Sequence, residues 1–125
     1  MSENEISYLI RGAIVKVYCN LGPGIFESAY EAALIHELRN LNLQVSTQVP
    51  VPLIYDSVRM EVCFRLDILV ENLVIIEVKS VEHLLEVHHK QLLTYLKLSG
   101  LKLGILVNFN SDDISKSIFR KVNGL

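Results

Sequence analysis

The sequence predicts a small α/β (α+β) fold in which helices flank a mixed central sheet. Two kinds of pattern support this prediction. Apolar residues recur every three to four positions in the first 42 residues, and again from about 84 to 99, as in amphipathic helices. Between these stretches, and after the second, lie runs rich in valine, isoleucine and leucine that are typical of buried strands. With 125 residues, the chain has the length of one ordinary domain, and we expect residues 1–125 to form it.

Two helices are expected at the start of the chain. The apolar stripe of the first consists of Ile6, Leu9, Ile10, Ala13, Ile14 and Val17. Glycine and proline at 22–24 end this helix. The second helix, from about 25 to 42, has on one face Glu27, Tyr30, Leu34, Leu38 and Leu41. One carboxylate therefore lies among apolar neighbours, and a core-facing carboxylate requires a partner.

Three strands, a helix, a strand and a helix are expected to follow. Residues 44–55 favour a strand, but Pro50 and Pro52 cannot donate ladder hydrogen bonds and so suit a sheet edge. Apolar runs at about 60–70 and 74–80 predict a hairpin that is buried on both faces. Beyond it, a helix over 84–99, a strand over 101–109 and a last helix from about 112 to 121 complete the order ααβββαβα.

Composition narrows the classes of function. No apolar run is long enough to span a membrane, and the N-terminal segment is acidic where a secretory signal would be basic, so we expect a cytoplasmic protein. Cys19 and Cys63 lack the spacing of a zinc or redox motif, and we expect both to be buried free thiols. A net charge of −2 and a pI of about 6.1 mean that any nucleic-acid function depends on a local site.

The predicted hairpin carries four charged residues among its aliphatic ones. Strand side chains alternate between two faces, so Arg65 and Asp67 share one face of the first strand, and Glu77 and Lys79 share one face of the second. A three-residue turn at 71–73 would place Asp67 opposite Glu77 and Arg65 opposite Lys79. A two-residue turn would separate the two pairs, because a one-residue slip in register exchanges the faces of a strand.

Two alternatives follow for these charges. In the three-residue register the carboxylates of Asp67 and Glu77 would lie about 5 Å apart at Cβ, which destabilises the strands unless a cation lies between them. Two carboxylates with a backbone carbonyl and waters suit Mg²⁺ or Mn²⁺, and the Lys79 ammonium could stabilise charge on a phosphate or assist an attacking water. The purely structural alternative is a cross-strand ion-pair network on a solvated face.

Several motifs together resemble a known family. Leu66-Asp67 in one strand and Glu77-Val78-Lys79 in the next resemble the signature of the PD-(D/E)xK nuclease superfamily, with leucine replacing the usual proline. Residues 24–30, Gly-Ile-Phe-Glu-Ser-Ala-Tyr, resemble the naming motif of the small prokaryotic GxxExxY proteins within that superfamily, and HHKQLLTYL (88–96) and LVNF (106–109) also resemble that group. The resemblance extends over about residues 5–122 and implies a restriction-endonuclease-like αβββαβ core.

The resemblance also implies a metal-dependent nuclease, in which a metal-activated water hydrolyses a phosphodiester bond. Mg²⁺ or Mn²⁺ would be held by Asp67, Glu77 and the backbone carbonyl of Val78. Lys79 would act on the water and the phosphate, and Glu27 would reach the site from the preceding helix. Glu27 has a second interpretation, because a carboxylate in the first turn of a helix interacts favourably with the helix dipole.

The helix predicted over 84–99 contributes further candidates. His88, Gln91 and Tyr95 follow a three-then-four spacing that places them on one face. The resemblance implies that Gln91 is a catalytic residue, and that His88 and Tyr95, together with Tyr30, support the site. The alternative is a helix packed by its leucines, with these polar side chains forming hydrogen bonds at its margin.

A small basic cluster on the predicted last helix consists of Lys116, Arg120 and Lys121. It could contact a phosphate backbone, or it could be an ordinary solvated face. We expect nucleic acid as the partner, with DNA favoured over RNA, and an apolar chain of this size could also form a homodimer. The alternative function is a catalytically silent module that binds nucleic acid or a protein, which the acidic pI and the small number of basic residues favour.

Overall fold

The computed structural model describes all of residues 1–125 and contains three α-helices, one short 3₁₀-helix and one five-stranded sheet. In chain order the elements are α1 (Glu3–Leu21), α2 (Glu27–Asn40), β1 (Val45–Tyr55), β2 (Val58–Val70), β3 (Val74–Lys79), α3 (Glu86–Ser99), β4 (Leu103–Asn108), η1 (Ile114–Lys116) and β5 (Ile118–Val122). The strands lie in the order β1-β2-β3-β4-β5, and only β3 and β4 are parallel. β1 is an edge strand, as its prolines predict.

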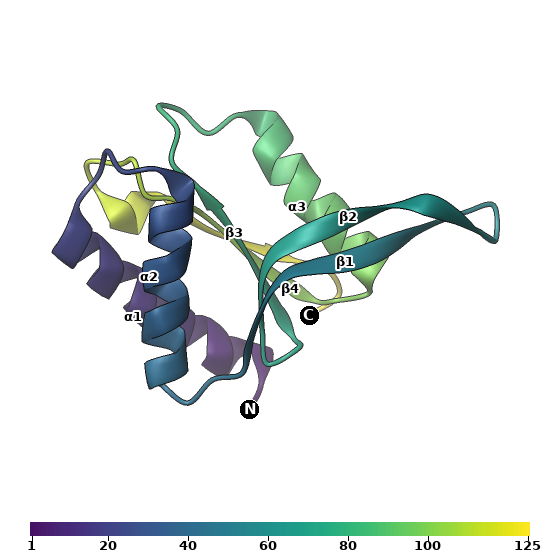
Figure 1. Cartoon of the computed structure of the whole chain (residues 1–125), viewed down its shortest axis with the longest axis horizontal. Helices are drawn as coiled ribbons and strands as arrows, with labels where there is room; N and C mark the ends of the chain where they lie inside the picture. Colours follow the sequence, from purple (N-terminus) through teal and green to yellow (C-terminus); the bar gives the residue numbers. More distant parts are fainter.

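The helices cover both faces of the sheet, as predicted (Figure 1). α1 and α2 pack on one face, where alternate residues of β2, β3 and β4 complete a core of 20 buried side chains. α3 packs on the other face, where Leu92 and Leu96 contact Leu66, Leu69, Ile75 and Leu106. Burial on both faces explains why β3 and β4 consist almost entirely of aliphatic residues.

The ends of α1 and α3 follow from local sequence signals. Ser2 and Glu5 form a capping box at the start of α1. α1 ends at Gly22 with φ 68°, and α3 ends at Gly100 with φ 76°, a backbone region that favours glycine. No helix has the length and apolar character needed to cross a bilayer.

Two predictions from the sequence are wrong. Residues 112–121 do not form a helix: Asp113 caps only the single turn η1, and the chain then extends as β5 along the free edge of β4. Pairing with β4 provides ladder hydrogen bonds that a short isolated helix would lack. Cys19 and Cys63 are both exposed thiols, because one lies on the outer surface of α1 and the other on a part of β2 that nothing covers.

β1 and β2 continue beyond the sheet as a two-stranded arm, residues 48–66, which projects from the body (Figure 1). The arm bends away at Asp67. Leu66 and Leu69 pack in the same cluster under α3, although a three-residue spacing in a regular strand would direct them to opposite faces. Gln48, opposite Asp67 in the register of the two strands, has φ 51°, which is strained for a residue other than glycine.

Candidate active site

The turn between β2 and β3 contains three residues, Glu71 to Leu73, and Val70 pairs with Val74. Glu71 and Asn72 both have positive φ, of 53° and 55°, which gives this tight turn its direction. This register places Asp67 opposite Glu77. Of the two registers that the sequence left open, the structure therefore has the three-residue one.

Asp67 and Glu77 meet where the backbone ladder between β2 and β3 stops. The last backbone pair is Ile68 with Ile76. Beyond it, Asp67 Oδ2 accepts a hydrogen bond from the Val78 N–H at 3.3 Å, and Glu77 Oε1 accepts a long one from the Asp67 N–H at 3.5 Å. Carboxylate oxygens thus take the place of backbone carbonyls, and the two strands separate around a pair of acidic side chains.

The side chain of Glu77 is buried and only 5% exposed. This burial is the main cause of the shift in its pKa. Burial, together with a hydrogen bond and like charge from Asp67, raises the pKa of Glu77 to about 9. The Asp67 N–H and the Lys79 ammonium oppose this shift in the pKa without reversing it. Without a cation beside it, Glu77 therefore keeps its proton at neutral pH.

α2 brings a further carboxylate, Glu31, toward this pair. Glu27 begins the helix, and Glu31 lies one turn later on the same face. Burial raises the pKa of Glu31, and the charges of Asp67 and Glu27 raise it further, while Lys79 lowers it. The sequence analysis did not identify Glu31, although its i+4 spacing from Glu27 was a signal that could have done so.

The donor atoms around Asp67 and Glu77 fit a divalent cation that prefers oxygen. A strand residue directs its N–H and its C=O to the same side, so the Val78 carbonyl faces the gap that its N–H spans toward Asp67. No three side chains of His, Cys, Asp or Glu are grouped closely enough to hold a metal alone. Two carboxylates and a carbonyl, completed by water and substrate oxygens, are the ligand set that Mg²⁺ usually takes.

Of the candidates on α3, Tyr95 approaches the acidic pair. Its ring stacks on Phe64 of the arm, with centroids 4.8 Å apart. Burial raises the pKa of Tyr95, and the charges of Glu77 and Asp67 raise it further. His88 instead accepts a hydrogen bond from the Leu85 N–H at the start of α3. Gln91 is exposed, and no hydrogen bond joins it to Lys79 or to either carboxylate.

Tyr30 stabilises the segment that leads into α2. Its hydroxyl donates to the Gly22 carbonyl and accepts from the Ile25 N–H, and its ring stacks on Phe109 with centroids 4.4 Å apart. The side chain is fully buried, so it cannot contact a substrate. Its contribution to a site is therefore indirect, through the position of Glu27.

A second polar anchor, Asn108, holds the loop that follows Lys79. Its Oδ1 accepts from the Val81 N–H, and its Nδ2 donates to the Val81 carbonyl. Ser80 also donates to the Ile25 carbonyl, which links this loop to the start of α2. Asn108 was not among the predicted site residues, although a lone amide in an apolar strand was a signal for it.

The predicted basic cluster does not form one face. Lys116 lies on η1, whereas Arg120 and Lys121 are neighbours on β5 and point to opposite sides. Arg120 donates a hydrogen bond to Asn4 of α1. The Lys121 ammonium lies on the other face of the sheet, 6.0 Å from the centre of the Phe119 ring. The prediction failed because it assumed helical spacing.

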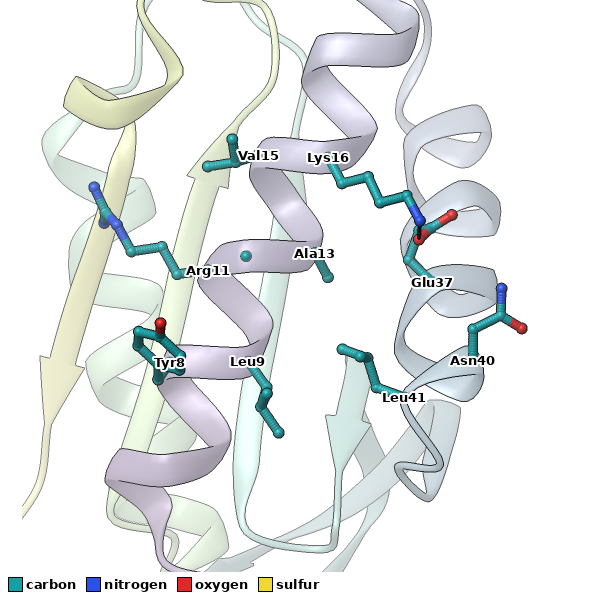
Figure 2. Close-up of a pocket in the computed structure, with 10 residues that line it drawn as sticks. Tyr8, Leu9, Arg11, Ala13, Val15, Lys16, Glu37, Asn40 and Leu41 are labelled. Atoms are coloured by element: carbon teal, nitrogen blue, oxygen red, sulfur yellow. Dashed lines mark ion pairs between the residues drawn. The ribbon is translucent and has the colours of Figure 1, made fainter.

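The grooves of the surface lie away from the acidic pair. A groove of about 640 Å³ runs between α1 and α2, where Lys16 forms an ion pair with Glu37 at 2.9 Å (Figure 2). A polar pocket of about 590 Å³ includes Asn108 and Asn110. Neither groove is lined by Asp67, Glu77 or Lys79. Asp67 and Lys79 are half-buried and Glu77 is buried, at the point where β2 and β3 separate.

Comparison with known proteins identifies the family. The family model of the PD-(D/E)XK nuclease superfamily matches residues 4–121, which is nearly the whole chain. Searches of curated proteins and of solved structures each gave no match. The mixed sheet with helices on both faces agrees with a restriction-endonuclease-like fold. The chain belongs to the PD-(D/E)XK nuclease superfamily.

Proposed function

We propose that the protein is a nuclease of the GxxExxY type, which hydrolyses phosphodiester bonds of nucleic acid with Mg²⁺ or Mn²⁺. The observation that carries this proposal is the carboxyl pair of Asp67 and Glu77 at the separation of β2 and β3. A buried glutamate with a pKa of about 9 is costly to ionise unless a cation compensates. The match to a nuclease superfamily over residues 4–121 supports the same function.

In this proposal Asp67, Glu77 and the Val78 carbonyl hold the ion. The ion supplies Lewis acidity and lowers the pKa of a water. Lys79, the next residue on the same strand face as Glu77, binds a non-bridging phosphate oxygen and stabilises the charge that develops there. Glu31 lies close enough to Asp67 to influence this charge balance, and Glu27 lies one turn before it on the same helix.

A polymer with exposed phosphates fits this location. Enclosed pockets usually bind small ligands, whereas neither surface groove includes these residues, and the half-buried Asp67 and Lys79 can be reached from solvent at the point where the strands separate. The phosphate backbone of nucleic acid could approach Lys79 there without entering a cavity. We propose DNA rather than RNA as the substrate.

One observation favours a second candidate function, a catalytically silent module that binds nucleic acid or a protein. No third ligating side chain joins Asp67 and Glu77 within metal distance, and Gln91 is exposed. Such a module would keep the fold of the superfamily and lack tight metal binding.

Calorimetric titration with Mg²⁺ and Mn²⁺, paired with a cleavage assay on labelled DNA and RNA, separates the two functions. We expect wild type to bind one ion and to cut nucleic acid, and Asp67→Asn and Glu77→Gln to lose both properties. Glu82→Gln removes an exposed carboxylate near β3 and serves as the matched control. Binding and cleavage that are unchanged in Asp67→Asn would contradict the proposal, whereas no metal binding by wild type would support the silent module.

A further inference from the structure

We propose that a second copy of this chain pairs with the outer edge of β2 along the arm, so that two copies form a symmetric dimer centred on Cys63. The inference concerns a surface remote from the carboxyl pair and does not depend on catalysis. It rests on the open edge of β2, on the direction of its backbone groups, and on the pattern of apolar and charged side chains along it.

The arm has one open edge and one blocked edge. β2 pairs with β3 only at residues 68–70, so no strand covers its outer edge along the arm. On β1 the outer edge carries Pro50 and Pro52, which lack the N–H that a pairing strand needs. A strand can therefore add to the arm only along β2.

The prolines also show which backbone N–H and C=O groups of β2 do not bond to β1. Pro50 lies opposite Arg65, and Pro52 lies opposite Cys63. Directly opposite residues of an antiparallel pair either exchange two hydrogen bonds or exchange none, and a proline cannot donate. Arg65 and Cys63 therefore direct their N–H and C=O groups away from β1, toward the open edge. The register of β1 with β2 shifts between Pro52 and Ile54, and Glu61 has no partner on β1.

The alternate residues form an apolar face on the same stretch. Phe64 and Leu66 share one side of β2, where Phe64 stacks on Tyr95 and Leu66 is buried under α3, and Val62 is the next alternate residue toward the tip. Val62 is 62% exposed, and Val58 nearer the tip is 56% exposed. A partner strand in this position would cover Val62 by placing it opposite Phe64 of the other copy.

The charged residues of β2 favour one register for its pairing with the second copy. A two-fold axis at Glu61 would oppose two glutamates, and an axis at Val62 would oppose Arg59 with Arg65. An axis at Cys63 opposes Glu61 with Arg65 twice, and neither residue has an ion-pair partner within its own chain. This register also places Cys63 opposite Cys63, and the backbone groups of Cys63 in each copy face the open edge.

Charge reversal tests the surface. We expect wild type to have the mass of a dimer in light scattering, and Glu61→Arg or Arg65→Glu alone to weaken the dimer at least about tenfold, because like charges then face each other. The double variant Glu61→Arg/Arg65→Glu restores the pair and should return to within about threefold of wild type. A monomeric wild type, or a double variant no better than the single ones, would overturn the proposal.

The two exposed thiols provide a test of the register. Across a hydrogen-bonded pair the Cα atoms lie about 5.5 Å apart, within the range that a disulfide spans. Under a mild oxidant, each Cys63 thiol should lose one proton and one electron and form an interchain disulfide in the Cys19→Ser variant. Cys63→Ser, which keeps the exposed Cys19, is the matched control. Equal cross-linking of the two variants would contradict an axis at Cys63.

Discussion

Asp67 and Glu77 face each other across β2 and β3, and each carboxyl group accepts a hydrogen bond from a backbone N–H at the point where the strands separate. In a continuous sheet those N–H groups would bond to carbonyl oxygens. The pair therefore interrupts the sheet and places two acidic groups beside a strand whose other residues are almost all buried aliphatics. This arrangement lowers the stability of the metal-free protein in a way that depends on pH.

The first prediction concerns Glu77 and pH. Its pKa is raised from 4.5 to about 9 in the folded protein, so the folded state holds a proton that the unfolded state releases. The associated stability is complete below the unfolded pKa of 4.5 and is lost as pH rises through about 9. We expect the metal-free Glu77→Gln variant to be more stable than wild type by about 1–3 kcal/mol in mildly alkaline buffer. Its stability should also not fall with rising pH in the way that wild type does.

Urea denaturation of both proteins at several pH values with a chelator measures this difference. Glu82→Gln, which changes an exposed carboxylate, should follow wild type at every pH. A Glu77→Gln variant that loses stability with rising pH as steeply as wild type would show that Glu77 ionises normally.

Lys79 gives the second prediction. Its ammonium is half-buried at the end of β3, beside the carboxyl pair. Lys79→Ala should reduce cleavage by about 100-fold or more, because it removes the positive charge that stabilises the phosphate in the transition state. Removing a cation from beside two carboxylates should leave Mg²⁺ affinity equal or higher.

Initial rates and calorimetric titrations together distinguish this role from a structural one. Lys90→Ala, which removes an exposed lysine of α3, is the control for net charge. Loss of cleavage together with loss of metal binding in Lys79→Ala would indicate a damaged fold rather than a lost catalytic group.

Much of the fold could be predicted because it depends on local patterns. The aliphatic runs were sufficient to predict the hairpin of β2 and β3, but two registers stayed open, and only the structure shows the three-residue turn that pairs Asp67 with Glu77. The last segment could not be predicted in the same way: its charges suit a helix, and only the free edge of β4 makes a strand more stable. Likewise, Glu31 and Asn108 depend on contacts between α2, β2 and the loop after Lys79, which no local pattern contains.

The third prediction concerns Tyr30. Its buried hydroxyl bonds to the Gly22 carbonyl and the Ile25 N–H, so Tyr30→Phe leaves both backbone groups without this partner. We expect the free energy of unfolding to fall by about 1–3 kcal/mol. Tyr8→Phe removes a hydroxyl from a side chain that is 80% exposed, and it should change the free energy of unfolding little. Urea denaturation checks both variants, and equal stabilities would show that the hydroxyl of Tyr30 does not hold this turn.

The last prediction concerns Gly104, which lets α3 lie close to β4. A Cβ at this position would lie 2.8 Å from Leu92 Cδ1 and 3.0 Å from Leu92 Cγ, and Leu92 is fully buried and cannot turn away. Gly104→Ala should therefore destabilise the protein by about 1–3 kcal/mol, and should cost less in a Leu92→Ala background, where the clash is removed.

Gly12 of α1 provides the opposite case for comparison. A Cβ there meets nothing within 4 Å, so Gly12→Ala should stabilise the helix by about 0.5–1 kcal/mol through helix propensity alone. Because α3 carries Tyr95 to the carboxyl pair, displacement of this helix by Gly104→Ala should also slow cleavage, whereas Gly12→Ala should not. If thermal unfolding places both alanine variants on the same side of wild type, the packing of Leu92 on Gly104 is not what fixes α3 against the sheet.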